Sequence, residues 1–211
     1  VRPGVFIPRA HTETLVEALL RILSKTAAPL LAEVGTGSGA IAVSLLCACK
    51  GARLLGAELS ETARLTTLEN AERLGVADRI ELFAGDWLEW LPSLGHQFDV
   101  FVSNPPYIPL QQKSQLAREV LGEPHLALFG QDEDGLGFYR QFARLWPRFL
   151  KPSGFAAVET GAGQAEAVVE IFKETGWLEP QTFFDLGGIK RVVTAFRGAA
   201  GTSQAPGELI R

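Results

Sequence analysis

The segment from Phe98 to Tyr107 constrains the fold of this chain more than any other. It joins a mostly apolar run, Phe98 to Ser103, to the tetrapeptide Asn104-Pro105-Pro106-Tyr107. Apolar and β-branched residues without an internal breaker predict a strand that is buried on both faces, as in a parallel sheet. Two consecutive prolines cannot donate ladder hydrogen bonds and cannot continue directly into a helix, so the strand must end at Asn104. The segment therefore predicts an α/β fold with a rigid turn after a central strand.

The same turn carries polar groups that suit a planar amino group. An X-Pro step holds the preceding residue extended, so the carbonyls of Asn104 and Pro105 have fixed directions and are open to a ligand. The Asn104 side chain adds another acceptor, and Tyr107 adds a flat apolar face. This set can hold both hydrogens of an NH2 group that stacks on a ring. The simpler interpretation is a strand that ends in a Pro-rich turn capped by Asn104.

Length and composition indicate one enzyme-like domain. The 211 residues suit one α/β domain and are few for two. No apolar run approaches the roughly 20 residues of a membrane span, so we expect a soluble protein. The net charge of −4 offers no overall attraction to nucleic acid. We predict a domain over residues 1–197, a flexible Gly/Ala/Ser-rich tail over residues 198–211, and a monomer.

Two further features concern the cellular compartment and the start of the chain. Cys47 and Cys49 are two residues apart in an apolar helical segment, so we expect reduced packing residues and a cytoplasmic protein. The chain contains no Met and begins at Val1, which is typical of a processed start or of a fragment of a longer protein.

A glycine-rich loop follows the first predicted strand. The strand covers residues 30–34, the loop is Gly35-Thr36-Gly37-Ser38-Gly39, and a helix follows from Ala40 to about Cys49. Strand, glycine turn and helix form the nucleotide-binding arrangement, because glycines let the backbone approach a ligand and the helix start offers free N–H groups. Glu33 is unusual in a buried strand and is reasonable if it faces a cationic or amine-bearing ligand. The loop also fits the dinucleotide fingerprint, so NAD and other adenosine cofactors stay open.

Acidic residues end the next two predicted strands, over residues 53–59 and 79–87. Glu58 lies about twenty residues after the loop, where such folds bind ribose hydroxyls; the alternative is an acid that caps the following helix. Asp86 can accept a hydrogen bond from an adenine amino group, and Trp87 can lie near the ring. For Trp87 the alternative is a surface position.

The other elements complete a doubly wound pattern. The apolar segment from Val5 to Arg9 leads into a helix for which Thr12 is the expected N-cap; we first interpret Phe6 as hydrophobic packing at this entrance. The irregular segment from Tyr107 to about Gly135 is expected to cover the site. We expect further helices over residues 61–74, 135–150 and 164–175, and strands over residues 155–160, 182–186 and 191–196. The last two strands suit an antiparallel hairpin. The predicted fold is a mainly parallel seven-stranded sheet with this hairpin at its end.

These motifs together resemble a class I S-adenosylmethionine-dependent methyltransferase, which is Rossmann-like. More narrowly, the chain resembles the bacterial release-factor-specific protein glutamine N5-methyltransferase family, over residues 5–197. The narrower resemblance rests on Phe6-Ile7-Pro8-Arg9 with Thr12-Glu13, Glu123-Pro124 with Ala127-Leu128, Asp134-Gly135-Leu136, and Asp185-Leu186-Gly187-Gly188 with Arg191-Val192-Val193.

The resemblance implies methyl transfer from S-adenosylmethionine to the side-chain amide nitrogen of a glutamine in a peptide chain release factor. It implies no metal. The implied catalytic residues are Asn104, Pro105 and Tyr107, and the implied substrate-binding residues are Phe6, Asn104, Pro105, Pro106 and Tyr107. The implied cofactor-binding residues are Gly35, Thr36, Gly37, Ser38, Gly39, Glu58, Asp86, Trp87 and Asn104.

The chain departs from the family pattern in two places. Family members carry a helical N-terminal domain that helps to recognise the release factor, and no such domain precedes Val5 in this sequence. Where relatives have Pro-Glu or Pro-Asp before Thr12, this chain has Ala10-His11. Both departures concern docking of the substrate rather than the chemistry.

Two other functions compete with this interpretation. A nucleic-acid amino-methyltransferase can use the same Asn-Pro-Pro-Tyr turn, but it needs a base taken out of its stack and a basic track for the backbone. An NAD-dependent enzyme or a dinucleotide-binding module accounts for the glycine loop and Glu58 but leaves the turn at Asn104 unexplained.

Overall fold

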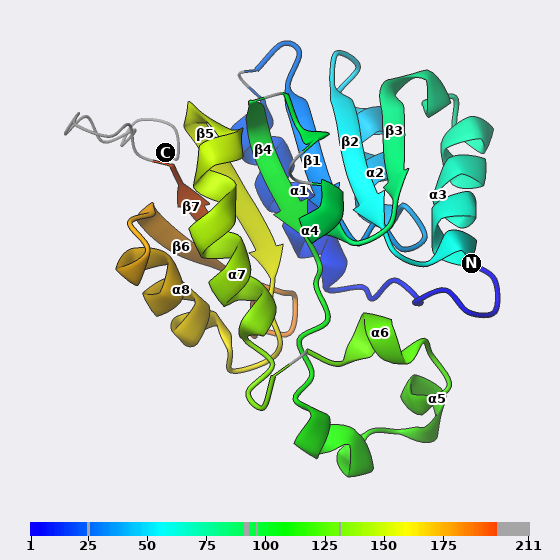
Figure 1. The fold of residues 1–211 in the computed structure, drawn as a ribbon, viewed down its shortest axis with the longest axis vertical. Helices are drawn as coiled ribbons and strands as arrows, with labels where there is room; N and C mark the ends of the chain where they lie inside the picture. Colours follow the sequence, from blue (N-terminus) through cyan, green and yellow to red (C-terminus); the bar gives the residue numbers. More distant parts are fainter. Residues whose placement is uncertain (25, 91–92, 96, 131, 198–211) are drawn as a thin grey trace.

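A twisted seven-stranded sheet forms the centre of the computed structural model, which describes residues 1–24, 26–90, 93–95, 97–130 and 132–197 (Figure 1). The strands are β1 (Leu30–Val34), β2 (Arg53–Glu58), β3 (Ile80–Ala84), β4 (Phe98–Ser103), β5 (Leu150–Glu159), β6 (Leu178–Phe184) and β7 (Lys190–Phe196). Their order in the sheet is β3-β2-β1-β4-β5-β7-β6. The first five strands pair in parallel, whereas β7 is antiparallel to both β5 and β6. The predicted sheet and C-terminal hairpin are confirmed.

Helices cover both faces of the sheet. The helices of the described residues are α1 (Thr12–Leu23), α2 (Ala40–Ala48), α3 (Glu61–Arg73), α4 (Trp87–Trp90), α5 (Arg118–Leu121), α6 (His125–Leu128), α7 (Gly137–Leu145) and α8 (Ala165–Glu174), of which α5 and α6 lie outside the two faces. Short 3-10 turns occur at Ala77–Arg79, Leu110–Gln115 and Trp146–Phe149. Helices α1 and α2 pack on one face, and α7 and α8 pack on the other (Figure 1). Among the described residues, no helix is long and apolar enough to cross a bilayer.

The helices on both faces of the sheet explain why its central strands are apolar throughout. In β4, Val100 and Val102 belong to the core on the α1 and α2 side, whereas Phe101 belongs to the core on the α7 and α8 side. Successive residues of a strand point to opposite faces, so a strand with helices on both sides needs apolar residues at every position. The uninterrupted run before Asn104 therefore marks the centre of the sheet.

Aromatic side chains fill the core between the sheet and α7. Phe142 of α7 lies against Phe101 of β4, with ring centroids 4.1 Å apart, and against Trp177, at 5.4 Å. Trp146 lies 4.3 Å from the same Phe101 ring. Both Phe142 and Trp146 have no exposed surface, so this cluster anchors α7 and the end of β4 to each other.

Several boundaries differ from the prediction. Helix α1 has His11 rather than Thr12 at its N-cap, and no side chain caps it; the Thr12 side chain is buried instead. Strand β3 ends at Ala84, because the Asp86 carboxylate accepts a hydrogen bond from the Leu88 N–H and the chain turns into α4. Strand β5 begins earlier than predicted, at Leu150.

The expected packing role of the cysteines is wrong for one of them. Cys47 is exposed, whereas Cys49 lies partly buried against the core; both are free thiols. The expected flexible tail over residues 198–211 lies outside the described residues.

The arrangement of the parallel strands determines where a ligand can bind. Strand β1 pairs with β2 on one side and β4 on the other, so the chain order reverses at β1. In open α/β sheets, ligands bind at the carboxyl ends of the strands beside such a reversal. The N-terminal segment and the segment that carries α5 and α6 lie beyond this edge of the sheet (Figure 1).

We predict that the aromatic core makes a large contribution to stability. Phe142→Ala should lower the free energy of unfolding by about 3–5 kcal/mol, as expected for removal of a buried aromatic ring. Phe184→Ala removes the same atoms at a residue that is 58% exposed. It should lower the free energy of unfolding by less than about 0.5 kcal/mol. Urea denaturation of both variants measures the difference. Similar losses in the two variants would contradict the assignment of the core.

Candidate active site

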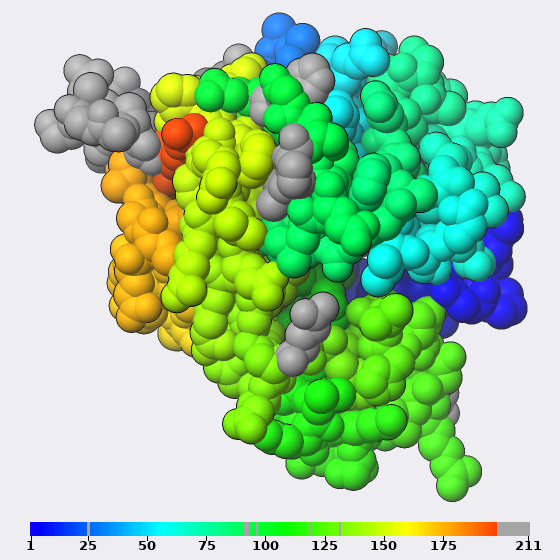
Figure 2. All heavy atoms as spheres, viewed as in Figure 1, coloured from blue at the N-terminus to red at the C-terminus, as the bar shows by residue number. Residues whose placement is uncertain are grey.

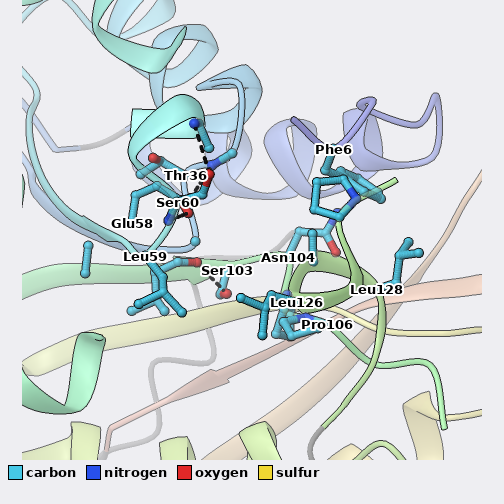
Figure 3. Close-up of a pocket in the computed structure, with 18 of the residues that line it drawn as sticks. Phe6, Thr36, Glu58, Leu59, Ser60, Ser103, Asn104, Pro106, Leu126 and Leu128 are labelled. Carbon is cyan, nitrogen blue, oxygen red and sulfur yellow. Dashed lines mark hydrogen bonds between the residues drawn. The ribbon is translucent and has the colours of Figure 1, made fainter. Parts of the chain in front are cut away.

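A cavity of about 560 Å³ lies at the carboxyl edge of the sheet, a volume typical of small-molecule sites. All but one of the site residues predicted from the sequence line it, namely Phe6, Gly35, Thr36, Gly37, Ser38, Glu58, Asp86, Trp87, Asn104, Pro105, Pro106 and Tyr107. Glu58 and Thr36 lie on one side of the cavity, and Asn104 and Phe6 lie on the other (Figure 3). The fold therefore brings the glycine loop and the Pro-rich turn to a single site.

The glycine loop presents its backbone to this cavity. Gly35 and Gly37 have φ angles of 73° and 59°, which L side chains rarely adopt, and a Cβ atom at either position would meet no atom within 4 Å. The exception among the predicted residues is Gly39, which does not line the cavity. A Cβ atom on Gly39 would lie 2.9 Å from the Thr67 side chain, so this glycine serves the close approach of α3.

Glu58 ties the end of β2 to the glycine loop. One carboxylate oxygen accepts a hydrogen bond from the Gly37 N–H and the other from the Ser60 N–H, both at 2.8 Å. The cap of α3 is Ser60, whose hydroxyl accepts from the Ala63 N–H, so the alternative of Glu58 as the helix cap is wrong. A carboxylate oxygen has two lone pairs, so each can accept one more hydrogen bond from a ligand.

Glu33 was expected to face a ligand, but it does not line the cavity. It is fully buried, it is not among the lining residues, and neither oxygen has a hydrogen-bond partner among the described residues. Burial raises the pKa of Glu33 well above its usual value, and the neighbouring charge of Glu58 raises it further.

Trp87 belongs to both the cavity and the aromatic core. It is half-buried, with its ring 5.6 Å from that of Phe138 and stacked at 6.4 Å on Trp146. The alternative of a surface tryptophan is therefore wrong. Asp86 precedes it at the cavity wall and starts the turn into α4.

The Pro-rich turn is held in place by residues from other elements. The Ser103 hydroxyl donates to the Val34 carbonyl at 2.8 Å, which joins the ends of β4 and β1. The Asn104 side-chain nitrogen donates to the Thr12 hydroxyl at 3.4 Å, which leaves the amide oxygen to accept a hydrogen bond. Sequence analysis missed this contact because Thr12 and Asn104 are 92 residues apart.

Tyr107 is fixed at both ends. Its backbone carbonyl accepts a hydrogen bond from the Gln164 amide at 3.0 Å, and its hydroxyl lies 3.4 Å from a carboxylate oxygen of Glu159. Burial raises the pKa of the Tyr107 hydroxyl, and the Glu159 charge adds to the effect. The hydroxyl is therefore neutral, and the ring forms part of the cavity wall.

Two segments close the cavity from outside the sheet. The segment after Tyr107 lines it through Ile108 and through residues 124–128, so the predicted cover is confirmed. Glu123 binds the N-terminal segment, because its carboxylate pairs with Arg9 and accepts from the Ile7 N–H at 3.2 Å. Figure 2 shows the N-terminal segment against the lobe that contains α5 and α6.

The same pairing positions Phe6. The Arg9 guanidinium lies over the Phe6 ring, 5.0 Å from its centroid, and Phe6 lines the cavity. The sequence gives little indication of the ion pair between Arg9 and Glu123. It shows only a basic residue in one motif and an acidic residue in another.

Comparison with known proteins identifies the family. A model named Methyltransferase small domain matches residues 1–129. A release factor glutamine methyltransferase of Clostridium acetobutylicum is 38% identical over 199 residues, which cover 94% of this chain and 70% of that protein. The chain belongs to the release factor glutamine methyltransferase family. A crystal structure of a release factor-specific protein-(glutamine-N5) methyltransferase from Alicyclobacillus acidocaldarius agrees, with 31% identity, a TM-score of 0.57, and coverage of 94% of this chain and 99% of that chain.

Other relatives are longer than this chain. It spans 66% of a release factor glutamine methyltransferase of Geobacter sulfurreducens, at 44% identity, and 41% of a bifunctional methyltransferase of Rickettsia felis, at 40% identity; each match covers 92% of this chain. The structure of a ribosomal protein L11 methylase from Lactobacillus delbrueckii shares the class I methyltransferase fold, with a TM-score of 0.64 at 19% identity over 94% of this chain and 84% of that chain.

One sequence element that supports family membership forms the β6–β7 turn. One Asp185 carboxylate oxygen accepts from the N–H groups of Gly187 and Ile189, both at 2.9 Å, and the other accepts from the Arg191 side chain at 3.2 Å. These hydrogen bonds hold the pKa of Asp185 below its usual value, and the one from the Ile189 N–H has the largest effect. The element therefore fixes the hairpin at the end of the sheet.

A second such element, Asp134-Gly135-Leu136, packs against the turn that ends at Tyr107. We predict that Gly135→Ala is destabilising, because φ at Gly135 is 72° and an added Cβ atom would collide with the Tyr107 carbonyl oxygen. Gly163→Ala is the matched control, since φ there is 82° but the space is open. Thermal and urea unfolding should show a strain cost of about 1–2 kcal/mol in both variants and an additional collision cost of about 1–3 kcal/mol in Gly135→Ala. Equal losses would show that the contact with Tyr107 does not constrain Gly135.

Proposed function

We propose that this chain transfers a methyl group from S-adenosylmethionine to the side-chain amide nitrogen of a glutamine in a peptide chain release factor. The observation that carries the proposal is the single cavity that joins the glycine loop and Glu58 to the turn at Asn104. Membership of the release factor glutamine methyltransferase family supports the choice of acceptor.

The lining residues fit the proposed cofactor. The open backbone of Gly35 and Gly37 can receive its amino-acid end, and the spare lone pairs of Glu58 can accept from its ribose hydroxyls. Asp86 and Trp87 also line the cavity, just after the end of β3 that pairs with Glu58, and they suit an adenine ring. When bound, S-adenosylmethionine supplies an electrophilic methyl group on a sulfonium. No metal is needed for this chemistry.

The turn at Asn104 would make the acceptor amide nitrogen more nucleophilic. An amide nitrogen is a poor nucleophile because its lone pair is delocalised into the carbonyl. The Asn104 side-chain oxygen and the Pro105 carbonyl can accept both N–H bonds, which pins the NH2 group and favours positive charge on nitrogen during attack. As the N–CH3 bond forms, the S–CH3 bond of the sulfonium would break; the N–H proton becomes acidic only then and would leave to solvent, so no side-chain base is required beforehand.

Positioning is therefore the main source of rate in this mechanism. Well-oriented groups can supply about 7–11 kcal/mol of a barrier. Phe6 and Tyr107 form apolar walls of the cavity, and both are held by contacts outside it, Phe6 through Arg9 and Tyr107 through Gln164. Such walls restrict the rotation of an amide that is held between them.

The competing functions account for less of the site. A nucleic-acid methyltransferase needs a basic track, and this chain has a net charge of −4. A dinucleotide-binding module gives no role to Asn104 and the prolines, which line the same cavity as the glycine loop. A release factor as acceptor agrees with a cytoplasmic protein that has two free cysteines, and we propose that location.

The identity of the acceptor is tested directly by offering three substrates with labelled S-adenosylmethionine. A release factor should accept one methyl group at a glutamine. The same factor with glutamate at that position should accept none, because a carboxylate brings acceptors to a pocket of acceptors; such discrimination can reach about 10⁴–10⁵. An adenine-containing oligonucleotide should stay unmodified. Mass spectrometry locates the methyl group, and preferential methylation of the oligonucleotide would favour the nucleic-acid enzyme.

Two substitutions should separate cofactor binding from transfer. Asn104→Ala should lower kcat/KM by an amount equivalent to about 2.7–4 kcal/mol, by analogy with loss of an oxyanion-hole donor, while cofactor affinity changes little. Glu58→Ala should weaken cofactor affinity, because ribose hydroxyls lose their acceptor. Calorimetry with S-adenosylmethionine and steady-state kinetics measure the two effects. Equal cofactor affinity in wild type and Glu58→Ala would contradict the ribose assignment, and near-normal transfer by Asn104→Ala would contradict the mechanism.

A further inference from the structure

Glu159, the last residue of β5, is a buried carboxylate that the proposed function does not use. It has no exposed surface and does not line the cavity. One of its oxygens, Oε2, has no hydrogen-bond partner among the described residues. Burying a carboxylate costs free energy unless its environment compensates the charge. Its position therefore requires an explanation.

The other carboxylate oxygen, Oε1, lies between two residues that flank the active-site turn. The Tyr107 hydroxyl donates to it at 3.4 Å, and the His11 Nε2 atom lies 3.1 Å from it, at ion-pair distance when the imidazole is protonated. His11 directly precedes Thr12, the residue that receives the Asn104 side chain. Glu159 is thus connected to the far end of the turn from Asn104.

Other contacts make this arrangement rigid. The Tyr139 hydroxyl of α7 donates to the Glu159 backbone carbonyl at 2.7 Å, and Glu159 pairs with Val192 in the sheet. Because Gln164 holds the Tyr107 carbonyl and Glu159 receives its hydroxyl, the ring is held along its length. The hydroxyl is directed at Glu159, so the ring presents an apolar surface to the cavity.

We propose that Glu159 is a positioning residue for the methyl transfer: it holds the Tyr107 hydroxyl and thereby fixes the ring against the acceptor amide. The inference rests on the proposed function. The His11 imidazole lies on the other side of the same carboxylate oxygen, with its Nε2 atom 3.1 Å away. Glu159 touches neither the cavity nor the acceptor and acts only through Tyr107.

A set of variants tests this role. Tyr107→Phe removes only the hydroxyl, Glu159→Ala removes the acceptor, and Glu159→Gln keeps an oxygen that can accept from Tyr107. Glu170→Ala, on the exposed side of α8, is the matched control. Each variant is assayed for kcat and KM with a release factor, for S-adenosylmethionine affinity by calorimetry, and for thermal stability.

A Tyr107 ring that is held less firmly should lower kcat and leave cofactor affinity unchanged. We expect Tyr107→Phe and Glu159→Ala each to lower kcat by about tenfold to a hundredfold, as for small misplacements of reacting groups, with cofactor affinity unchanged. Glu159→Gln should retain most of the activity, and Glu170→Ala all of it. The double variant Glu159→Ala/Tyr107→Phe should be no slower than either single variant, because both remove the same interaction.

Several outcomes would overturn the inference. Full activity of Tyr107→Phe, or multiplying losses in the double variant, would show that Glu159 does not act through the hydroxyl. Loss of activity in Glu159→Gln equal to that in Glu159→Ala would assign the effect to charge instead. If Glu159→Ala does not fold, Tyr107→Phe and Glu159→Gln decide. A wild-type protein that methylates no release factor would contradict the proposed function itself.

Discussion

The parallel pairing of β1 with β4 is the constraint on which the rest of the site depends. The register places Val34 beside Ser103, and the Ser103 hydroxyl bonds the Val34 carbonyl at 2.8 Å. The next residue on one strand starts the glycine loop, and the next on the other is Asn104. A shift of the register by one residue would exchange the faces of Phe101 and its valine neighbours, so the close packing on the two faces opposes it. The glycine loop and the turn at Asn104 therefore meet because of packing in the body of the sheet.

Most of the fold could be predicted from the sequence because its signals are local. The bounds of β1 and β4 follow from apolar runs that end at Gly35 and at Pro105, and the C-terminal hairpin follows from its short Gly-rich connection. Glu58 was found by its distance from the loop along the chain. These features depend on neighbours in sequence, so composition and spacing carry them.

The supporting residues of the site could not be predicted in this way. Thr12, Glu123 and Glu159 meet their partners across 92, 114 and 52 residues of sequence, and nothing near each residue indicates which partner it will have. Thr12 was misinterpreted as a helix cap for this reason. Gly39 was assigned to the ligand because a glycine that admits a neighbouring helix has the same local pattern as one that admits a cofactor.

The link between Arg9 and Glu123 separates two kinds of residue in this chain. Phe6 and Arg9 belong to no strand or helix and to neither of the two hydrophobic core clusters, yet Phe6 forms a wall of the cavity. Loss of the contacts of Phe6 and Arg9 would therefore leave the sheet and its helices intact. The thermal unfolding of the protein would then be unchanged, while the wall of the cavity was altered. Folding therefore places little constraint on Phe6 and Arg9, whereas the shape of the cavity depends on them.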